Sequence, residues 1–305
     1  MSSTVTEARP LEAQNGGQAG GSGAQSTQDR SIGTIISEAR NLSAEQVEQI
    51  LVYQRKNSVR FGEAAIALGF ASTDDVLFAL AQQFHYPYAA EEQRKTSPEL
   101  IALNQPFSLQ AEAFRAIRSQ VMMRVFGDAE AGRRALAVIS SDHGDGKTYF
   151  AANLAVTLAQ LGGRTLLVDA DLRSPRQHEV FNVRNDAGLS GILAGRSEAQ
   201  VIQQIAGVPS LFILPVGVTP PNPVELVERP AFGLLIRELV AKFDHVIVDT
   251  PAASSGSDAS VIAARCGSAL VVARKNQSSV HALQDLVATL TGTPARLAGV
   301  IVNEF

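Results

Sequence analysis

The sequence predicts an α/β protein in which helices cover both faces of a parallel sheet, preceded by a small helical domain. The evidence for the sheet is that short apolar runs rich in β-branched residues alternate with stretches of helical periodicity from residue 106 onward, as in parallel strands joined by crossover helices. The evidence for the helical domain is that residues 31–90 repeat a pattern of short helix, turn and second helix.

Composition excludes several classes of protein. The 305 residues carry a formal net charge of −4 and a single cysteine, Cys266. A nucleic-acid binder normally presents a basic face and an internal disulfide needs two cysteines, so we expect neither a nucleic-acid partner nor a secreted disulfide scaffold. No apolar run approaches the ~20 residues of a membrane helix, and no signal-peptide pattern follows Met1. The chain is therefore expected to be cytoplasmic.

Two segments lack the apolar pattern of a folded unit. Residues 1–30 are rich in Gly, Ser, Gln and Ala. Such a composition buries too little surface to offset its ordering entropy, so a disordered tail is expected there. Residues 91–105 are expected to form a linker to the sheet domain, residues 106–305.

The helical domain, residues 31–90, is built from a repeat. The stretch 61–83 aligns with 32–54, and glycines, serines and apolar residues recur at equivalent places. Ser43 and Ser72 precede the second helix of each unit and are expected to be its N-caps. We expect a compact domain of two helical hairpins.

The sheet domain alternates strands and helices in order. Strands are predicted at 135–140, 165–170, 211–216, 245–249, 269–273 and 298–302, and helices at 147–162, 231–242, 257–265 and 280–291.

The first predicted strand runs directly into a glycine-rich loop, SDHGDGKT (141–148), which opens a helix. Gly144 and Gly146 allow backbone N–H groups to approach phosphate oxygens, and the helix N-terminus favours an anion. Lys147 is expected to reach the β- and γ-phosphates and Thr148 to coordinate Mg²⁺. The segment therefore predicts a phosphate-binding loop (P-loop), although Ser141 replaces the usual first glycine.

Carboxylates follow two later strands. Asp169 and Asp171 end the strand TLLVDA, and Asp249 ends the strand HVIVD. Because ligands of open parallel sheets bind at the carboxyl ends of the strands, these groups are expected to meet the P-loop and form a Mg²⁺–nucleotide site. Asp249 is the expected Walker-B acid. Asn303, at the end of the last strand, is a candidate to hydrogen-bond the base.

Residues 106–305 resemble the bacterial tyrosine kinases of polysaccharide biosynthesis. The resemblance rests on DHGDGKT, LLVDADLRSPRQH and VIVDTPA in this order, with Asp258 downstream, and on the segment PPNPVEL. It also rests on Glu112, Arg115 and Arg118, which fit an E-x-x-R-x-x-R helix that makes ring-forming subunit contacts in that family.

The resemblance implies an ATP- and Mg²⁺-dependent protein-tyrosine kinase that regulates exopolysaccharide chain length, polymerisation or export. The implied catalytic residues are Lys147, Asp169, Asp171 and Asp249; the nucleotide-binding residues are Gly144, Asp145, Gly146, Lys147, Thr148, Tyr149 and Asn303; the metal-binding residues are Thr148, Asp169 and Asp249; and the oligomer contacts are Glu112, Arg115 and Arg118. Asp169 is the candidate to accept the tyrosine proton or to bind the metal.

Two other functions remain open. Septum-site and chromosome-partitioning ATPases have a signature lysine where this chain has Asp142, which favours the kinases, but an ATPase switch without tyrosine transfer is an alternative. The other alternative is an adaptor whose front domain binds a dinucleotide or a partner. The sequence does not identify the polysaccharide or the ring size.

The acceptor tyrosine is an open question. The family usually carries a tyrosine-rich C-terminal tail, whereas this sequence has four tyrosines, Tyr53, Tyr86, Tyr88 and Tyr149, and no such cluster. Tyr86 and Tyr88 are substitute acceptors or packing residues, and another protein is the further possibility. Because family members without membrane helices require a separate one, the expected partner is a membrane-embedded chain-length determinant. The expected location is then the inner face of the cytoplasmic membrane.

The front repeats resemble the N-terminal domain of type II secretion and pilus-assembly ATPases. In some of these, paired R-L-G-x-x-L…Q motifs bind cyclic di-GMP. The second unit has Arg60, Gly62 and Gln83, but the first begins with Ser31 in place of the arginine. Cyclic di-GMP binding or partner docking is therefore expected for this domain.

Overall fold

The computed structural model describes residues 31–83, 97–127, 132–196 and 200–304. The predicted tail, the first part of the predicted linker, and both Tyr86 and Tyr88 lie outside these ranges.

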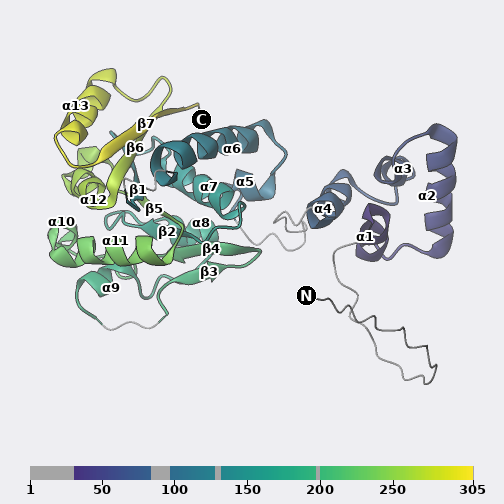
Figure 1. Ribbon diagram of the computed structural model, residues 1–305, viewed down its shortest axis with the longest axis horizontal. Helices are drawn as coiled ribbons and strands as arrows, with labels where there is room; N and C mark the ends of the chain where they lie inside the picture. The colour runs from purple at the N-terminus through teal and green to yellow at the C-terminus, as the bar shows by residue number, and fades with distance from the viewer. Residues whose placement is uncertain (1–30, 84–96, 128–131, 197–199, 305) are drawn as a thin grey trace, which may run out of the picture.

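Four helices, purple to blue in Figure 1, form the front unit: α1 (Ile32–Ala39), α2 (Ala44–Asn57), α3 (Phe61–Ala67) and α4 (Thr73–Gln83). Both predicted serine caps are present, because the hydroxyl of Ser43 accepts from the N–H of Gln46 at 3.2 Å and that of Ser72 from Asp75 at 3.2 Å. A separate cluster of buried apolar side chains, including Ile36 and Ile50, holds the helices together.

Gly62 explains why the repeat keeps a glycine at this place. A Cβ atom there would lie 2.8 Å from a methyl carbon of Val76, so only glycine lets α3 approach α4 this closely. The equivalent Gly33 packs against the ring of Phe61, where a Cβ would lie 3.5 Å away. Gly62 thus lies at the contact between the two helices of the second unit, and Gly33 at a contact between the two units.

The described part of the sheet domain has one seven-stranded sheet with the order β3-β4-β2-β5-β1-β6-β7. Its strands are β1 (Ala135–Ser140), β2 (Thr165–Asp169), β3 (Gln203–Ile205), β4 (Val208–Leu214), β5 (His245–Asp249), β6 (Gly267–Arg274) and β7 (Arg296–Asn303). All pairs are parallel except β3 with β4. The six predicted strands and the α/β fold are confirmed; β3 was not predicted because three residues with two glutamines give no apolar pattern.

Helices cover both faces of the sheet, as predicted (Figure 1). The helices of this domain are α5 (Ile101–Asn104), α6 (Leu109–Val121), η3 (a π-helical turn, Met122–Phe126), α7 (Lys147–Ala159), α8 (Gln177–Phe181), α9 (Leu189–Leu193), α10 (Pro223–Glu228), α11 (Pro230–Lys242), η4 (a 3₁₀ turn, Ala253–Ser255), α12 (Asp258–Cys266) and α13 (Val280–Thr291).

The two layers follow from strand periodicity. In β1, Ala135, Ala137 and Ile139 face the cluster formed with α9 to α13. Leu136 and Val138 face the cluster formed with α5 to α8. Because alternate side chains of a strand point to opposite faces, a strand that is apolar throughout can serve two cores, as the continuous burial of β1 requires.

Residues 97–105, assigned to a linker from the sequence, are packed against α7. The amide of Asn153 accepts from Ala102 N at 2.9 Å and donates to Glu99 O at 2.9 Å, and Leu100 and Leu103 are buried. The segment is too short and too irregular for a periodic signal, so its packing was not evident from the pattern. No helix of the described residues has both the length and the apolar character needed to span a bilayer.

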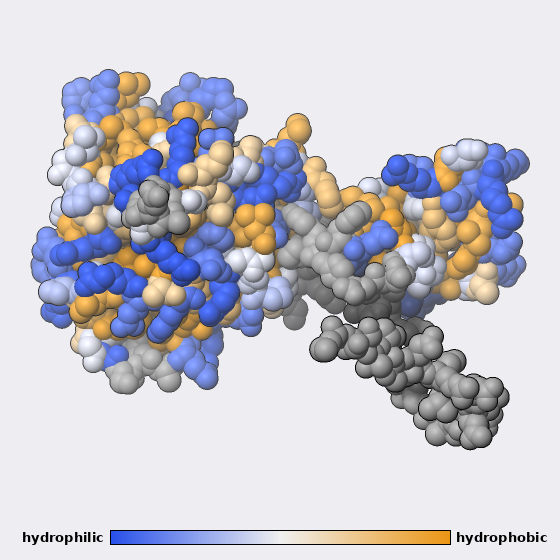
Figure 2. Space-filling model, in the orientation of Figure 1, coloured by the Kyte–Doolittle hydropathy of each residue, from blue (hydrophilic) through white to orange (hydrophobic). Residues whose placement is uncertain are grey.

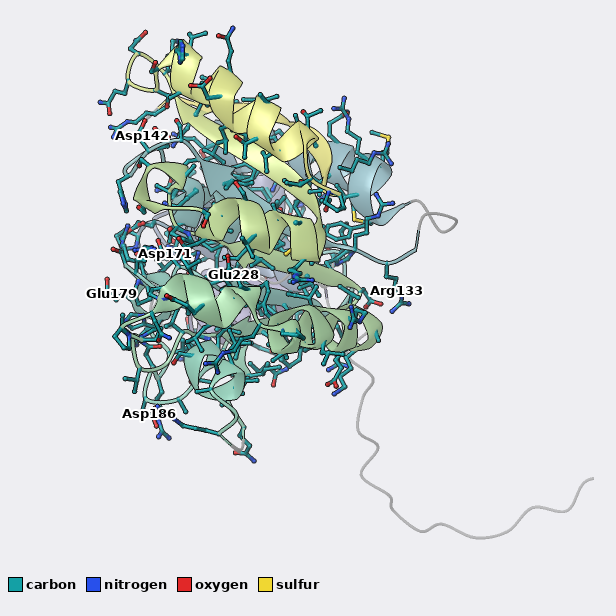
Figure 3. The ribbon with its side chains drawn as sticks, turned by 90° about the vertical axis from the view of Figure 1, so that its left-hand side faces the viewer. Arg133, Asp142, Asp171, Glu179, Asp186 and Glu228 are labelled. Carbon is teal, nitrogen blue, oxygen red and sulfur yellow. The ribbon has the colours of Figure 1, made fainter. Side chains whose placement is uncertain are left out.

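Figure 2 shows hydrophilic and hydrophobic residues intermingled on the face of the sheet domain that it presents. In the side view of Figure 3, Asp142 and Asp171 lie on one side of the sheet domain, and Arg133 lies on the opposite side. The P-loop and the first acidic turn are therefore on the same side, as expected for the carboxyl ends of parallel strands.

Candidate functional site

The P-loop connects β1 to α7 and has the backbone conformation that its glycines permit. Gly144 and Gly146 have φ angles of 83° and 91°, and Gly146 is the N-cap of α7. A side chain at Gly146 would also collide with the amide of Asn303. Ser141 is not among the described residues with positive φ, so the loop does not need a glycine at its first position.

The side chain of Asp145 fastens the loop from within. Asp145 is only 3% exposed. Its Oδ2 accepts from the N–H of Asp142 at 3.0 Å and from the hydroxyl of Ser141 at 3.3 Å. Its Oδ1 accepts from the hydroxyl of Ser278, in the loop between β6 and α13, at 2.7 Å. Ser278 in turn accepts from Arg274 N at 2.6 Å. Sequence reasoning missed Ser278, because nothing local marks a serine so distant in the chain.

The ends of β6 and β7 make two further contacts with the loop. Arg274 Nη1 donates to Gly144 O at 3.2 Å, and Asn303 Nδ2 donates to Asp145 O at 3.2 Å. Asn303 thus lies beside the P-loop with its amide nitrogen bonded to the loop backbone, and its contact with the base remains a prediction. Together with Ser278 these residues form what we call the loop clamp.

Asp249 lies beside Lys147 and is fully buried. Burial raises the pKa of Asp249 to about 6, while the positive charge of Lys147 opposes this shift. Its Oδ2 accepts from Gln177 Nε2 at 2.9 Å. Its Oδ1 has no hydrogen-bond partner among the described residues. The hydroxyl of Thr148 is close enough to lower the Asp249 pKa, so three of the predicted residues meet here.

Asp169 is the partner of Asp249 in the neighbouring strand. Its Oδ1 accepts from the N–H of Asp171 at 3.2 Å, and its Oδ2 from those of Arg176 and Gln177 at 3.2 and 3.0 Å. Burial, and then the charge of Asp249, raise the pKa of Asp169 well above its usual value. Asp169 therefore lies beside Asp249 and caps the start of α8, and its role toward metal or substrate remains a prediction.

Asp171 lies in the turn after β2. It is 3% exposed, and its Oδ1 accepts from Arg173 N at 3.2 Å and Ser174 N at 2.9 Å. The turn is held to α12 by an ion pair between Arg173 Nη2 and Asp258 Oδ2 at 3.0 Å, in which Asp258 is 2% exposed. The order of the acidic turn thus depends on a pair of residues 85 positions apart.

A pocket of about 470 Å³ opens beside the P-loop. Its lining residues are Pro98, Glu99, Ile101, Gln110, Gly144, Gly146, Tyr149, Arg274 and Asn303. Tyr149 packs edge-on against Phe114 of α6 with ring centroids 5.8 Å apart, and burial followed by the charge of Glu99 raises its pKa. Several residues predicted from the sequence therefore line one pocket beside the P-loop backbone. They are Gly144, Gly146, Tyr149 and Asn303.

The residues present fit a Mg²⁺ ion held together with phosphate. Mg²⁺ prefers oxygen ligands, keeps several waters and is usually held by one or two carboxylates plus substrate phosphates. The unpartnered Oδ1 of Asp249 and the nearby hydroxyl of Thr148 offer such oxygens. Within the described ranges no group of three or more His, Cys, Asp or Glu residues forms a complete metal site.

The predicted oligomer residues lie on α6 and make contacts within the chain. Arg115 Nη2 pairs with Glu112 Oε2 at 2.7 Å, and its Nη1 donates to Pro106 O at 2.7 Å. Arg118 Nη1 donates to Thr157 O, on α7, at 2.9 Å. These side chains hold α6 to its surroundings, and ring contacts remain a prediction.

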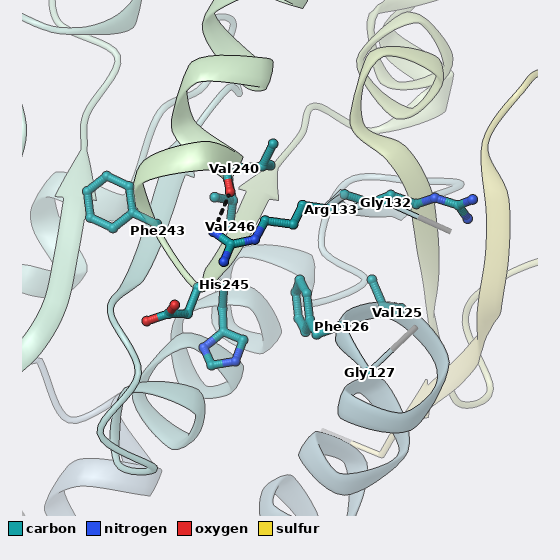
Figure 4. A pocket seen from close by; sticks show the side chains of 11 residues that line it. Val125, Phe126, Gly127, Gly132, Arg133, Val240, Phe243, His245 and Val246 are labelled. Atoms are coloured by element: carbon teal, nitrogen blue, oxygen red, sulfur yellow. Dashed lines mark hydrogen bonds between the residues drawn. The ribbon is translucent and has the colours of Figure 1, made fainter. Parts of the chain in front are cut away.

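A second pocket, of about 360 Å³, is lined by Arg133 and by His245 at the start of β5 (Figure 4), and Arg133 lies on the side of the sheet domain opposite Asp142 and Asp171 (Figure 3). Arg133 extends across it, with Nη1 3.4 Å from Val240 O, and the ring of His245 packs edge-on against Phe126 at 5.0 Å. Burial lowers the pKa of His245. None of the predicted site residues lines this pocket.

The comparisons with known proteins cover this domain. Residues 136–305 match the model of the CobQ/CobB/MinD/ParA nucleotide binding domain. The chain is 32% identical over 216 residues to the putative tyrosine-protein kinase CapB of Staphylococcus aureus, covering 70% of this chain and 92% of that protein. It is 31% identical over 210 residues to the tyrosine-protein kinase wzc of Salmonella typhi, of which it spans 29% against 69% of its own length.

A solved structure gives the same result. The kinase domain of Escherichia coli tyrosine kinase ETK superposes with a TM-score of 0.64 at 31% identity, covering 69% of this chain and 81% of that one.

Proposed function

Because this chain belongs to the CobQ/CobB/MinD/ParA nucleotide-binding family and, within it, to the bacterial tyrosine-protein kinases, we propose that it transfers the γ-phosphoryl group of ATP to protein tyrosine in exopolysaccharide assembly. The observation that carries the proposal is the meeting of Lys147, Thr148 and a half-satisfied Asp249 carboxylate at one P-loop. Phosphoryl transfer depends chiefly on positioning and on neutralising phosphate charge, and this arrangement supplies both.

Each residue has a role that its surroundings support. The N–H groups of the P-loop and the N-terminus of α7 bind phosphate oxygens, and Lys147 places a positive charge on them. Asp249 and Thr148 would hold Mg²⁺, which when bound neutralises charge on the β- and γ-phosphates. Asp169, which lies beside Asp249 in the neighbouring strand, accepts the proton of the tyrosine hydroxyl in its ionised form. Asp171 orders the turn beside it.

The test is formation of phosphotyrosine by the full chain with ATP and Mg²⁺, detected with an anti-phosphotyrosine antibody in the presence of a candidate chain-length determinant. Lys147→Met and Asp249→Asn should abolish the signal. Lys242→Met and Asp186→Asn are matched controls, since both residues form ion pairs with exposed side chains, and should retain it. Wild-type signal in either site variant would refute the assignment. ATP hydrolysis without phosphotyrosine would favour the ATPase switch.

The partner and location follow from the same resemblance. We assign the chain to the inner face of the cytoplasmic membrane through a membrane-embedded chain-length determinant protein, as a homo-oligomeric ring with contacts through α6. Glu112→Lys should lower the mass measured by light scattering of the nucleotide-bound chain. An unchanged mass would remove α6 from the interface.

The front unit has a separate candidate ligand. Cyclic di-GMP is supported by Arg60, which precedes α3 at the start of the second repeat. Calorimetry of the full chain at tens of micromolar should detect binding that Arg60→Ala abolishes. No heat would leave partner docking as the role of this unit.

A further inference from the structure

Gln177, the first residue of α8, touches all three motifs of the site and was not singled out in the sequence. Its backbone N–H donates to Asp169 Oδ2 at 3.0 Å. Its side-chain Nε2 donates to Asp249 Oδ2 at 2.9 Å and to the carbonyl of Thr148 at 3.1 Å. The side chain is fully buried. One residue therefore connects the P-loop with the ends of β2 and β5.

The orientation of this amide is dictated by its neighbours. Both groups that face Nε2, a carboxylate oxygen and a backbone carbonyl, can only accept hydrogen bonds. A flipped amide would place three acceptors together, so the nitrogen must face them. As a result, Gln177 Oε1 is buried and has no partner among the described residues.

A second unpartnered acceptor belongs to the same hydrogen-bonded pair. Asp249 Oδ1 is also buried and without a partner in the described part of the chain. Buried acceptors are normally satisfied, and each orphan needs an explanation such as an ion or a water. The two unpartnered oxygens belong to the Gln177 amide and the Asp249 carboxylate, which are joined by the 2.9 Å hydrogen bond. This arrangement indicates that one polar ligand is shared by both groups.

We infer that Gln177 is a positioning residue that fixes Asp249 against the P-loop and offers its carbonyl oxygen to a water of the Mg²⁺ shell. The inference rests on the proposed function for the identity of the ion. Nε2 sets the direction of the Asp249 carboxylate, leaving Oδ1 for the metal side. Residues that orient metal ligands in this way typically affect metal affinity by about 10- to 100-fold.

The test measures how much Mg²⁺ strengthens nucleotide binding, a readout that a role in folding alone would not change. A fluorescent N-methylanthraniloyl-ADP is titrated into the full chain with Mg²⁺ and with EDTA, and the ratio of the two Kd values is compared. Gln177→Met removes both polar groups at similar size. Gln177→Asn keeps an amide but shortens the reach, and it carries the test if the methionine variant does not fold.

The wild-type ratio should fall by about tenfold in both variants. Gln160→Met is the matched control: it removes a hydrogen bond of 3.1 Å to Ala102 O at the C-terminal end of α7, the opposite end of that helix from the P-loop, and should leave the ratio unchanged. A ratio unaffected by either Gln177 variant, or a wild type without Mg²⁺ enhancement, would overturn the inference. If the Gln177 variants lower the ratio but the wild-type chain forms no phosphotyrosine, the proposed function is refuted and the inference stands.

Discussion

Ser278→Ala removes the hydroxyl that joins the P-loop to the loop between β6 and α13. Ser278 donates to Asp145 Oδ1 at 2.7 Å and accepts from Arg274 N at 2.6 Å. A hydrogen bond to a charged group contributes about 1.5–3 kcal/mol, and Ser278 is only half-buried, so the lower end applies. The lost acceptor for Arg274 N adds about 0.5–1 kcal/mol. We expect the free energy of unfolding to fall by about 2–2.5 kcal/mol.

A double-mutant cycle isolates the bond itself. Urea unfolding of Ser278→Ala, Asp145→Ala and the double variant should give a coupling energy of about 1.5–2 kcal/mol. Asp145 also accepts from the N–H of Asp142 in the P-loop. The affinity of the Ser278→Ala variant for ADP should therefore fall about tenfold, which corresponds to 1.4 kcal/mol. Ser279→Ala, which removes the neighbouring cap of α13, should cost about 1 kcal/mol without affecting ADP.

Two results would refute this reasoning. A coupling energy below about 0.3–0.5 kcal/mol would mean that Ser278 and Asp145 do not stabilise one another. Loss of stability with unchanged ADP affinity would mean that the clamp supports the fold but does not prepare the P-loop for phosphate.

Three further predictions concern buried ionisable groups. Arg173→Ala leaves Asp258, 2% exposed, without its cation and should lower the free energy of unfolding by about 3 kcal/mol in urea titrations; a loss below about 1 kcal/mol would contradict this. Cys266 is buried and its pKa is raised by burial, so native protein at pH 8 should react with a thiol reagent far more slowly than urea-unfolded protein; equal rates would refute the burial. Burial lowers the pKa of His245, so the unfolded chain binds a proton that the folded chain does not. The stability that neutral His245 contributes should be fully present above about pH 6.5 and decline as the pH falls below that value. The variant His245→Gln should therefore show a smaller loss of stability at low pH. A pH profile identical to that of the wild type would assign the decline to other groups.

Strand periodicity was sufficient to predict six of the seven strands of the described sheet. The strands β1 and β5 are buried at every position and have apolar residues along their middles, because each strand packs against helices on both faces. The front repeats were equally readable, since Ser43 caps α2 by a local hydrogen bond. Short pieces such as β3 and α5 gave no signal, because their places depend on contacts with distant residues.

The site divides in the same way. Lys147, Thr148 and Asp249 were predictable because a P-loop needs fixed residue types at fixed local spacing, and because strand ends in a parallel sheet meet at one edge. Their predicted roles remain to be tested by the variants above. Gln177 and Ser278 were not predictable, since a glutamine after a turn and a serine in a loop carry no local pattern.

The sequence by itself therefore determined the α/β fold and the phosphate-binding chemistry, because both depend on local periodicity and spacing. Only the tertiary structure decided how that chemistry is held. Gln177 reaches Asp249 across 72 positions, and Ser278 reaches Asp145 across 133. Hydrogen bonds between such distant residues form only once the strands have brought their ends together, so no local pattern records them.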